Sequence, residues 1–102
     1  MIDLHHDHIA IAKAILKRHV GNTEVRAFGS RVTGKAKPHS DLDLVIVGTE
    51  KLDGKVINRL KLDFEESNLP FRVDVMDWYA IGPQFQSMIE SRYELMNLQD
   101  EM

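Results

Sequence analysis

Three aspartates in this 102-residue chain have the spacing of a cation-binding site. Asp41 and Asp43 are two residues apart in a run with the pattern of a β-strand, so both side chains project from one face, with α-carbons about 6.5–7 Å apart. Asp74 belongs to a second alternating run, where Val73 and Val75 should face the core and leave Asp74 on the opposite face. If the strands pair, the three carboxylates repel one another unless divalent cations neutralise them. The cluster therefore predicts two Mg²⁺ ions that hold phosphoryl oxygens.

A glycine–serine turn with cations nearby predicts a phosphate site beside these carboxylates. Gly29 and Ser30 follow a short β-favouring run, where glycine lets a ligand approach the backbone and the first amides of a helix point at an anion. Ser30 adds a hydroxyl donor, while Arg31, Lys35 and Lys37 supply positive charge. Together these residues are typical of a site for a nucleoside triphosphate.

The elements that must position these residues alternate between helix and strand. The pattern predicts helices over 7–20, 53–67 and from Gly82 onward, a helical turn over 31–35, and strands over 24–28, 41–47 and 71–76. This order predicts an α/β fold: a small mixed sheet of at least three strands, with helices packed mainly on one face and the acidic site on the other. We expect a single domain over 1–102, in which residues 95–102 form a flexible tail.

Composition narrows the range of functions. Hydrophobic residues make up 43% of the chain and charged residues 28%, which is the balance of one globular domain. The net charge of −3 argues against direct nucleic-acid binding, and the lack of cysteine restricts metal ligands to oxygen and imidazole. Because no apolar run could span a bilayer and no signal-peptide pattern is present, we predict a cytoplasmic protein without membrane contact.

The joint spacing of the motifs resembles that of DNA polymerase β-like nucleotidyltransferases. The motifs are Phe28-Gly29-Ser30, then, after ten residues of which Ser40 is the last, Asp41-Leu42-Asp43-Leu44, and later Val73-Asp74-Val75. The short chain is most similar to minimal nucleotidyltransferases encoded beside HEPN-domain proteins, which include antitoxins that adenylylate a HEPN ribonuclease toxin. It departs from many relatives at Thr33, where they carry a second arginine.

This resemblance implies the polymerase β-like fold and Mg²⁺-dependent transfer of a nucleoside monophosphate, AMP from ATP, to a hydroxyl group. The implied acceptor belongs to a helical HEPN toxin, for which this protein would be the antitoxin. Catalytic and metal-binding roles fall on Asp41, Asp43 and Asp74, and nucleotide-binding roles on Gly29, Ser30, Arg31, Lys35 and Ser40.

Other interpretations stay open. The acceptor could be a small molecule such as an aminoglycoside, held by a separate subunit, or the chain could bind nucleotide or toxin without turnover. Asp77 is assigned to a turn or cap, and the histidines near the N-terminus to an exposed end. On the last helix, Phe85, Met88 and Ile89 are predicted to point into the core.

Overall fold

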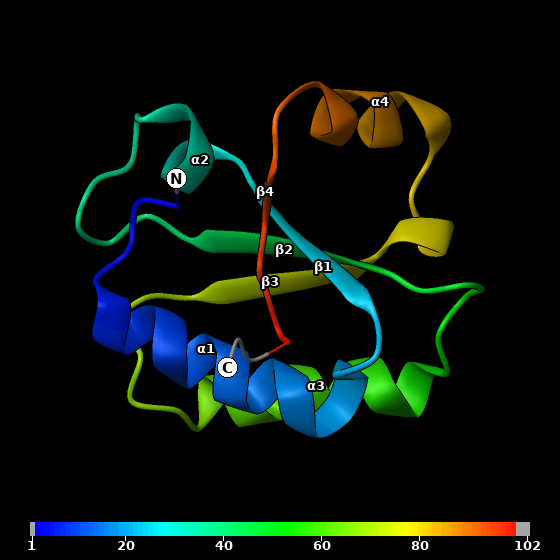
Figure 1. Ribbon diagram of the computed structural model, residues 1–102, viewed down its shortest axis with the longest axis horizontal. Helices are drawn as coiled ribbons and strands as arrows, with labels where there is room; N and C mark the ends of the chain where they lie inside the picture. Colours follow the sequence, from blue (N-terminus) through cyan, green and yellow to red (C-terminus); the bar gives the residue numbers. More distant parts are fainter. Residues whose placement is uncertain (1, 100–102) are drawn as a thin grey trace.

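The computed structural model describes residues 2–99 as a sheet with helices on both sides (Figure 1). The elements are α1 (His6–Val20), β1 (Glu24–Phe28), α2 (Ser30–Thr33), β2 (Leu42–Val47), α3 (Gly54–Glu65), β3 (Val73–Asp77), the 3₁₀ helix η1 (Trp78–Ala80), α4 (Pro83–Ser91) and β4 (Glu94–Leu95). Every helix and strand predicted from the sequence is present, with ends shifted by a few residues. None of the described helices is long and apolar enough to cross a membrane.

The sheet is mixed and has the strand order β3-β2-β1-β4. β1 runs antiparallel to both β2 and β4, whereas β2 and β3 run parallel and place Asp43 directly opposite Asp74. Because β2 and β3 are parallel, the chain between them must cross back over one face, and α3 forms that crossover. The predicted pairing of the two acidic strands is therefore confirmed.

One face of the sheet packs against α1 and α3, which lie together below it in Figure 1. The apolar stripes that the sequence predicts on these helices meet alternate residues of the strands. Leu16 and Leu60 contribute from the helices, while Leu44 and Ile46 contribute from β2, and all four are fully buried. Asp53 caps α3 by accepting a hydrogen bond from the amide of Lys55, as its residue type favours.

The opposite face is divided between an apolar end and the acidic site. At the apolar end, Ile89 of α4 packs on Phe28 and Val45, with Phe85 and Trp78 beside them. Helices therefore cover part of the second face as well, and the expectation that they lie mainly on one face holds for the long helices α1 and α3.

Two sequence-based predictions are wrong. Residues 95–102 do not form a flexible tail throughout, because Leu95 belongs to β4, and Met96 and Leu98 are buried in the main core; residues 100–102 lie outside the described part of the chain. Met88 does not point inward, since 51% of it is exposed. α4 contacts the sheet through the narrow stripe of Phe85 and Ile89, four residues apart, and Met88 lies to one side of that stripe.

Candidate active site

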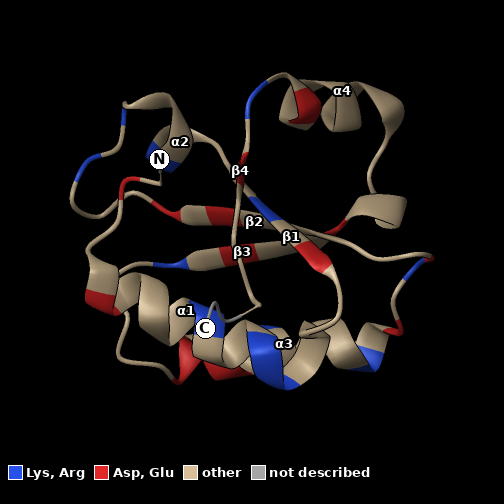
Figure 2. Ribbon diagram, in the orientation of Figure 1, with Lys and Arg blue, Asp and Glu red and all other residues tan. Residues whose placement is uncertain are grey.

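The three predicted carboxylates come from two neighbouring strands on the divided face. Asp43 lies within β2 and Asp74 within β3 at the same register, and Asp41 directly precedes β2. All three are half-buried. Figure 2 shows acidic residues in β2 and β3, with basic residues in the loop between α2 and β2. Strand alternation thus brings together residues that are more than thirty positions apart in sequence.

Asp43 carries the electrostatic signature of this cluster. Burial, together with the negative charges of Asp74 and Asp41, raises the pKa of its carboxyl group from 3.8 to about 6, whereas Arg72 opposes the shift. Two neighbouring carboxylates disfavour the ionised form of Asp43, and a cation bound nearby would favour it. The three aspartates therefore form an anionic centre with Asp43 in the middle.

The donor set suits a hard divalent cation. Carboxylate oxygens are the ligands that Mg²⁺ prefers, and the raised pKa of Asp43 indicates negative charge that its surroundings do not balance. The three carboxylates are less tightly spaced than the donor atoms of His5, His6 and Asp7, which all lie within 4.8 Å of one another at the exposed start of α1. The wider spacing is what repulsion between like charges favours.

Gly29 makes room for Asp43. Its φ angle of 80° is in the region that favours glycine, and a Cβ atom at this position would lie only 2.5 Å from Oδ2 of Asp43. The carboxylate therefore occupies the space that a side chain at Gly29 would fill. The sequence predicts a glycine here that lets a ligand approach the backbone, and the structure shows a different reason for glycine, the nearby Asp43 carboxylate.

The other predicted phosphate-binding residues lie in α2 and in the loop that follows it. Ser30 begins α2 and is half-buried, and the amides of Val32 and Thr33 donate to the carbonyl of Gly29. Lys35 is exposed in the loop that follows. The hydroxyl of Ser40 accepts a hydrogen bond from the Lys37 amide at 2.8 Å, so Ser40 helps to close this loop.

Arg31 differs from the other predicted nucleotide ligands. It is only 6% exposed, and its Nε, Nη1 and Nη2 atoms each donate to a backbone carbonyl of the protein. The sequence places it next to Ser30 and so close to the phosphate site, but its side chain points into the protein.

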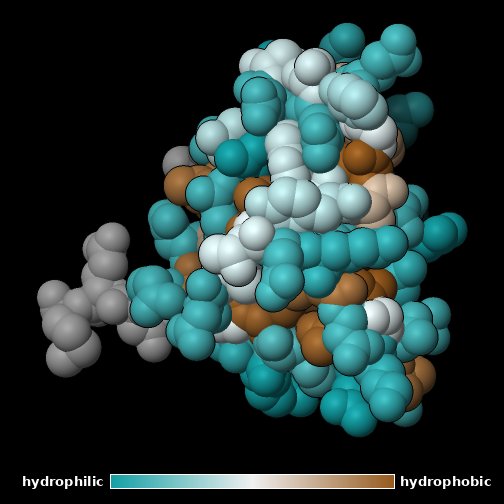
Figure 3. Space-filling view, turned by 90° about the vertical axis from the view of Figure 1, so that its right-hand side faces the viewer, coloured by the Kyte–Doolittle hydropathy of each residue, from teal (hydrophilic) through white to brown (hydrophobic). Residues whose placement is uncertain are grey.

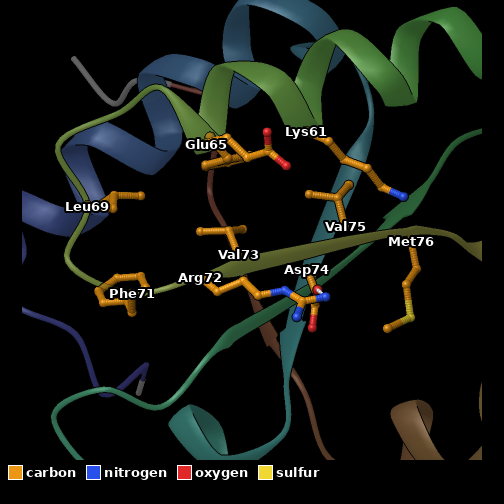
Figure 4. A pocket seen from close by; sticks show the side chains of 10 residues that line it. Lys61, Glu65, Leu69, Phe71, Arg72, Val73, Asp74, Val75 and Met76 are labelled. Atoms are coloured by element: carbon orange, nitrogen blue, oxygen red, sulfur yellow. Dashed lines mark ion pairs between the residues drawn. The ribbon is translucent and has the colours of Figure 1, made fainter.

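Arg72 is a site residue that sequence reasoning missed. Its Nη2 atom lies 3.0 Å from Oδ1 of Asp74, and Figure 4 shows the two side chains meeting at the edge of the sheet. The signal was present, because residues two apart in a strand share a face. The pair borders a groove of about 590 Å³ between β3 and α3, whose wall includes Lys61 and Phe71. Of the three aspartates, Asp74 is the one that contributes to the lining of this groove, at the edge strand.

Asp77 ends β3 without taking part in this centre. Its carboxylate accepts hydrogen bonds from the amides of Leu52, at 2.7 Å, and Tyr79, at 3.1 Å. The residue is buried, and it caps η1 while fixing the start of the segment that leads into α3. The predicted cap role of Asp77 is confirmed.

Comparison with known proteins now decides the family. Residues 9–96 match the model of the nucleotidyltransferase domain. The chain belongs to this nucleotidyltransferase family. It is also 47% identical over 92 residues to the probable protein adenylyltransferase MntA of Haemophilus influenzae, a match that covers 90% of this chain and 81% of the relative. The polymerase β-like resemblance and the enzyme class predicted from the sequence are confirmed.

Solved structures show the same fold. A toxin–antitoxin complex with AMP-PNP matches with a TM-score of 0.72 at 18% identity, covering 86% of this chain and 71% of that one. The spectinomycin adenyltransferase AAD(9) of Enterococcus faecialis, solved with ATP and spectinomycin, matches with a TM-score of 0.52 at 23% identity. That match covers 90% of this chain but 48% of the other. The same fold can thus form part of a longer chain.

Proposed function

We propose that this nucleotidyltransferase transfers AMP from ATP to a hydroxyl group of a toxin of the HEPN class and thereby acts as its antitoxin. The observation that carries the proposal is the register of β2 and β3, which pairs Asp43 with Asp74 beside Gly29. Its support from outside this chain is the 47% identity to a probable protein adenylyltransferase. The toxin–antitoxin structure with AMP-PNP supports the pairing of this fold with a partner and a nucleotide.

The acidic residues take the metal-binding roles in this proposal. Asp41, Asp43 and Asp74 would hold two Mg²⁺ ions, which would stabilise negative charge on the phosphates and lower the pKa of the attacking hydroxyl. The hydroxyl oxygen forms a bond to the α-phosphorus of ATP, and the bond to pyrophosphate breaks. In this proposal Asp74 also receives the hydroxyl proton.

The nucleotide phosphates are proposed to lie over the turn between β1 and α2. Gly29 and Ser30 line this turn, and the Ser30 hydroxyl would donate to a phosphate oxygen. Lys35 is exposed in the next loop, from which its ammonium group could reach the end of a triphosphate. Ser40 contributes by closing this loop through its hydroxyl.

Apolar surface on the same molecule supports a protein acceptor. Between α3 and η1 lies a hollow of about 530 Å³ whose apolar wall includes Leu52, Ile57 and Ile81. Figure 3, which views this end of the molecule, shows hydrophobic atoms gathered between polar side chains. Tyr79 and Met88 are also about half exposed, at 46% and 51%. Such surfaces are typical of sites that contact another protein.

Intact-protein mass spectrometry tests the proposal. The chain is co-expressed with its candidate toxin, and the purified toxin is compared with toxin made alongside the Asp41→Asn, Asp43→Asn variant. We expect one or more added AMP groups only with the unaltered protein. Modification of an aminoglycoside together with an unmodified toxin would favour the small-molecule alternative. No modification of either, with ATP still bound in a calorimetric titration, would favour a binding protein without turnover.

A further inference from the structure

Arg31 is a buried cation whose recorded hydrogen-bond partners are carbonyl oxygens. Nε donates to the carbonyl of Ser40 at 2.9 Å, Nη1 to that of Asp3 at 2.9 Å, and Nη2 to that of Pro38 at 3.2 Å. A buried guanidinium must satisfy its donors to offset the loss of hydration. Here those donors are directed at the main chain of two separate segments.

These hydrogen bonds fix the chain directly before the acidic strand β2. Pro38 and Ser40 belong to the loop that connects α2 to β2, and Asp41 follows Ser40 immediately. The third carbonyl is that of Asp3, in the segment before α1. Asp3 and Arg31 form a second hydrogen bond, because the Asp3 amide donates to the Arg31 carbonyl at 2.6 Å. The position of Asp41 is thus coupled to the orientation of the guanidinium group.

The same guanidinium also contacts the entry to β3. Its central carbon lies 4.4 Å from the ring centre of Phe71, a distance typical of a cation–π contact. Phe71 is three residues before Asp74, and the next residue, Arg72, accepts a hydrogen bond at its carbonyl from the Leu42 amide at 2.9 Å. Arg31 therefore touches the approach to both strands that carry the acidic residues.

We propose that Arg31 is a positioning residue that fixes the loop over 35–40 and the start of β3, so that the carboxylates of Asp41 and Asp74 lie at the correct separation. The role rests on the proposed function of these carboxylates as metal ligands. A lysine cannot replace the arginine, because an ammonium group lacks the planar fork that reaches three carbonyls and stacks on the ring at once.

The test uses Arg31→Lys, with Arg59→Lys on the exposed surface of α3 as the matched control. Hydrogen exchange of the backbone amides over 35–41 is measured on the isolated protein, and Mn²⁺ binding by calorimetry. Mn²⁺ binding is assigned to the acidic centre where it is absent from the double variant Asp41→Asn, Asp43→Asn. For Arg31→Lys we expect about tenfold faster exchange in this loop and about tenfold weaker Mn²⁺ binding, because charged hydrogen bonds are lost. Arg59→Lys should change neither.

The alternative role, direct contact with phosphate, gives a different result. If Arg31→Lys leaves exchange and Mn²⁺ binding unchanged and weakens only nucleotide binding, the positioning role is wrong. Should Arg31→Lys fail to fold, Phe71→Leu decides, because it removes the stacking surface and keeps the hydrogen bonds. That variant should shift both measurements in the same direction by a smaller factor, and no shift would overturn the proposal.

Neither measurement requires turnover. A failure of AMP transfer by the unaltered protein would therefore count against the proposed function alone. The exchange comparison between Arg31→Lys and Arg59→Lys would still test the positioning role.

Discussion

The two faces of β2 have opposite characters at Asp43 and Leu44. Leu44 and Ile46 point into a continuous apolar core under α1 and α3 and are fully buried. Asp43, the residue before Leu44, points to the other face, where burial and two nearby carboxylates raise its pKa to about 6. One face of β2 thus stabilises the fold, while the other holds a carboxylate close to two others that repel it. Charge held at a cost to stability is typical of a functional site.

The divided face shows the same contrast between its two ends. Around α4, a half-buried cation is accommodated by aromatic rings. The central guanidinium carbon of Arg26 lies 4.3 Å from the ring centre of Tyr93 and 5.0 Å from that of Trp78, and its Nε atom pairs with Glu24. At the acidic end, the ion-pair partner of Asp74 is Arg72, which is exposed at the edge of the sheet. The end near α4 is packed, whereas at the acidic end Asp74 and Arg72 border the groove between β3 and α3.

The largest expected difference between the faces is in activity. Asp41→Asn with Asp43→Asn should reduce transfer of labelled AMP to the level of a reaction without enzyme, because the cation ligands are lost. The free energy of unfolding of the metal-free protein should stay the same or rise, since like charges are removed. Thermal unfolding and the transfer assay together check this prediction. Retention of full transfer by a folded double variant would show that these carboxylates are not the metal ligands.

The core face should respond in the opposite way. Leu44→Ala removes buried methyl groups and should lower the free energy of unfolding by about 2–5 kcal/mol, as measured by urea denaturation. At a temperature where the variant is still folded, its transfer rate should stay close to that of the unaltered protein. A large loss of transfer at full folding would mean that the faces are less independent than their packing indicates.

Two glycines with positive φ angles allow the contact with Asp43 to be tested against a glycine that lacks it. Gly34, with φ 82° and ψ 13°, is in the left-handed helical region, where alanine should cost about 1–2 kcal/mol of stability. Gly29, with φ 80° and ψ −156°, is in a region that is essentially restricted to glycine, so alanine should cost more there. Only at Gly29 would the new Cβ atom meet the Asp43 carboxylate, since nothing lies within 4 Å of the corresponding point at Gly34. We expect Gly29→Ala alone to weaken Mn²⁺ binding in a calorimetric titration. Equal affinities in the two variants would contradict the contact.

The smallest expected effect is a pH dependence of stability that has opposite signs in two regions. Asp43 has a pKa of about 6 in the folded protein and 3.8 as an ordinary carboxyl, so between these values the folded state binds more protons than the unfolded state. The free energy of unfolding of the metal-free protein should therefore fall as the pH rises through this window. Urea denaturation in the presence of a chelator measures it, and Asp43→Asn should remove this fall.

Asp63 is a control for the sign of the pH dependence of stability, because its pKa is shifted in the opposite direction. It accepts a hydrogen bond from His19 at 2.6 Å between α1 and α3, and this bond lowers the pKa of its carboxyl group. Its contribution should be present above pH 3.8 and be lost as the pH falls through the lowered pKa. Asp63→Asn should therefore lower the free energy of unfolding by a constant amount above pH 3.8, abolish the further loss at more acidic pH, and leave the slope between about pH 4 and 6 in place.

Local patterns predicted much of this molecule because they depend on neighbouring residues. The helical stripes, the cap at Asp53 and the alternation around Asp74 all have the structure that they predict. The strand over Glu94–Leu95 was missed, because two residues carry too little pattern to be distinguished from a tail. It exists because it pairs with β1, and the Met96 and Leu98 side chains that follow are covered by the core.

By itself, the sequence determined which carboxylates could share a face and where a glycine must allow a close approach, since strand alternation and the motif spacing contain that information. Only the tertiary structure decided which groups meet across the strands and loops. It placed Asp43 against Gly29, paired Arg72 with Asp74 and turned the Arg31 guanidinium toward backbone carbonyls. The physical reason is that a side chain's partners depend on contacts between segments distant in sequence, and residue types alone do not specify those contacts.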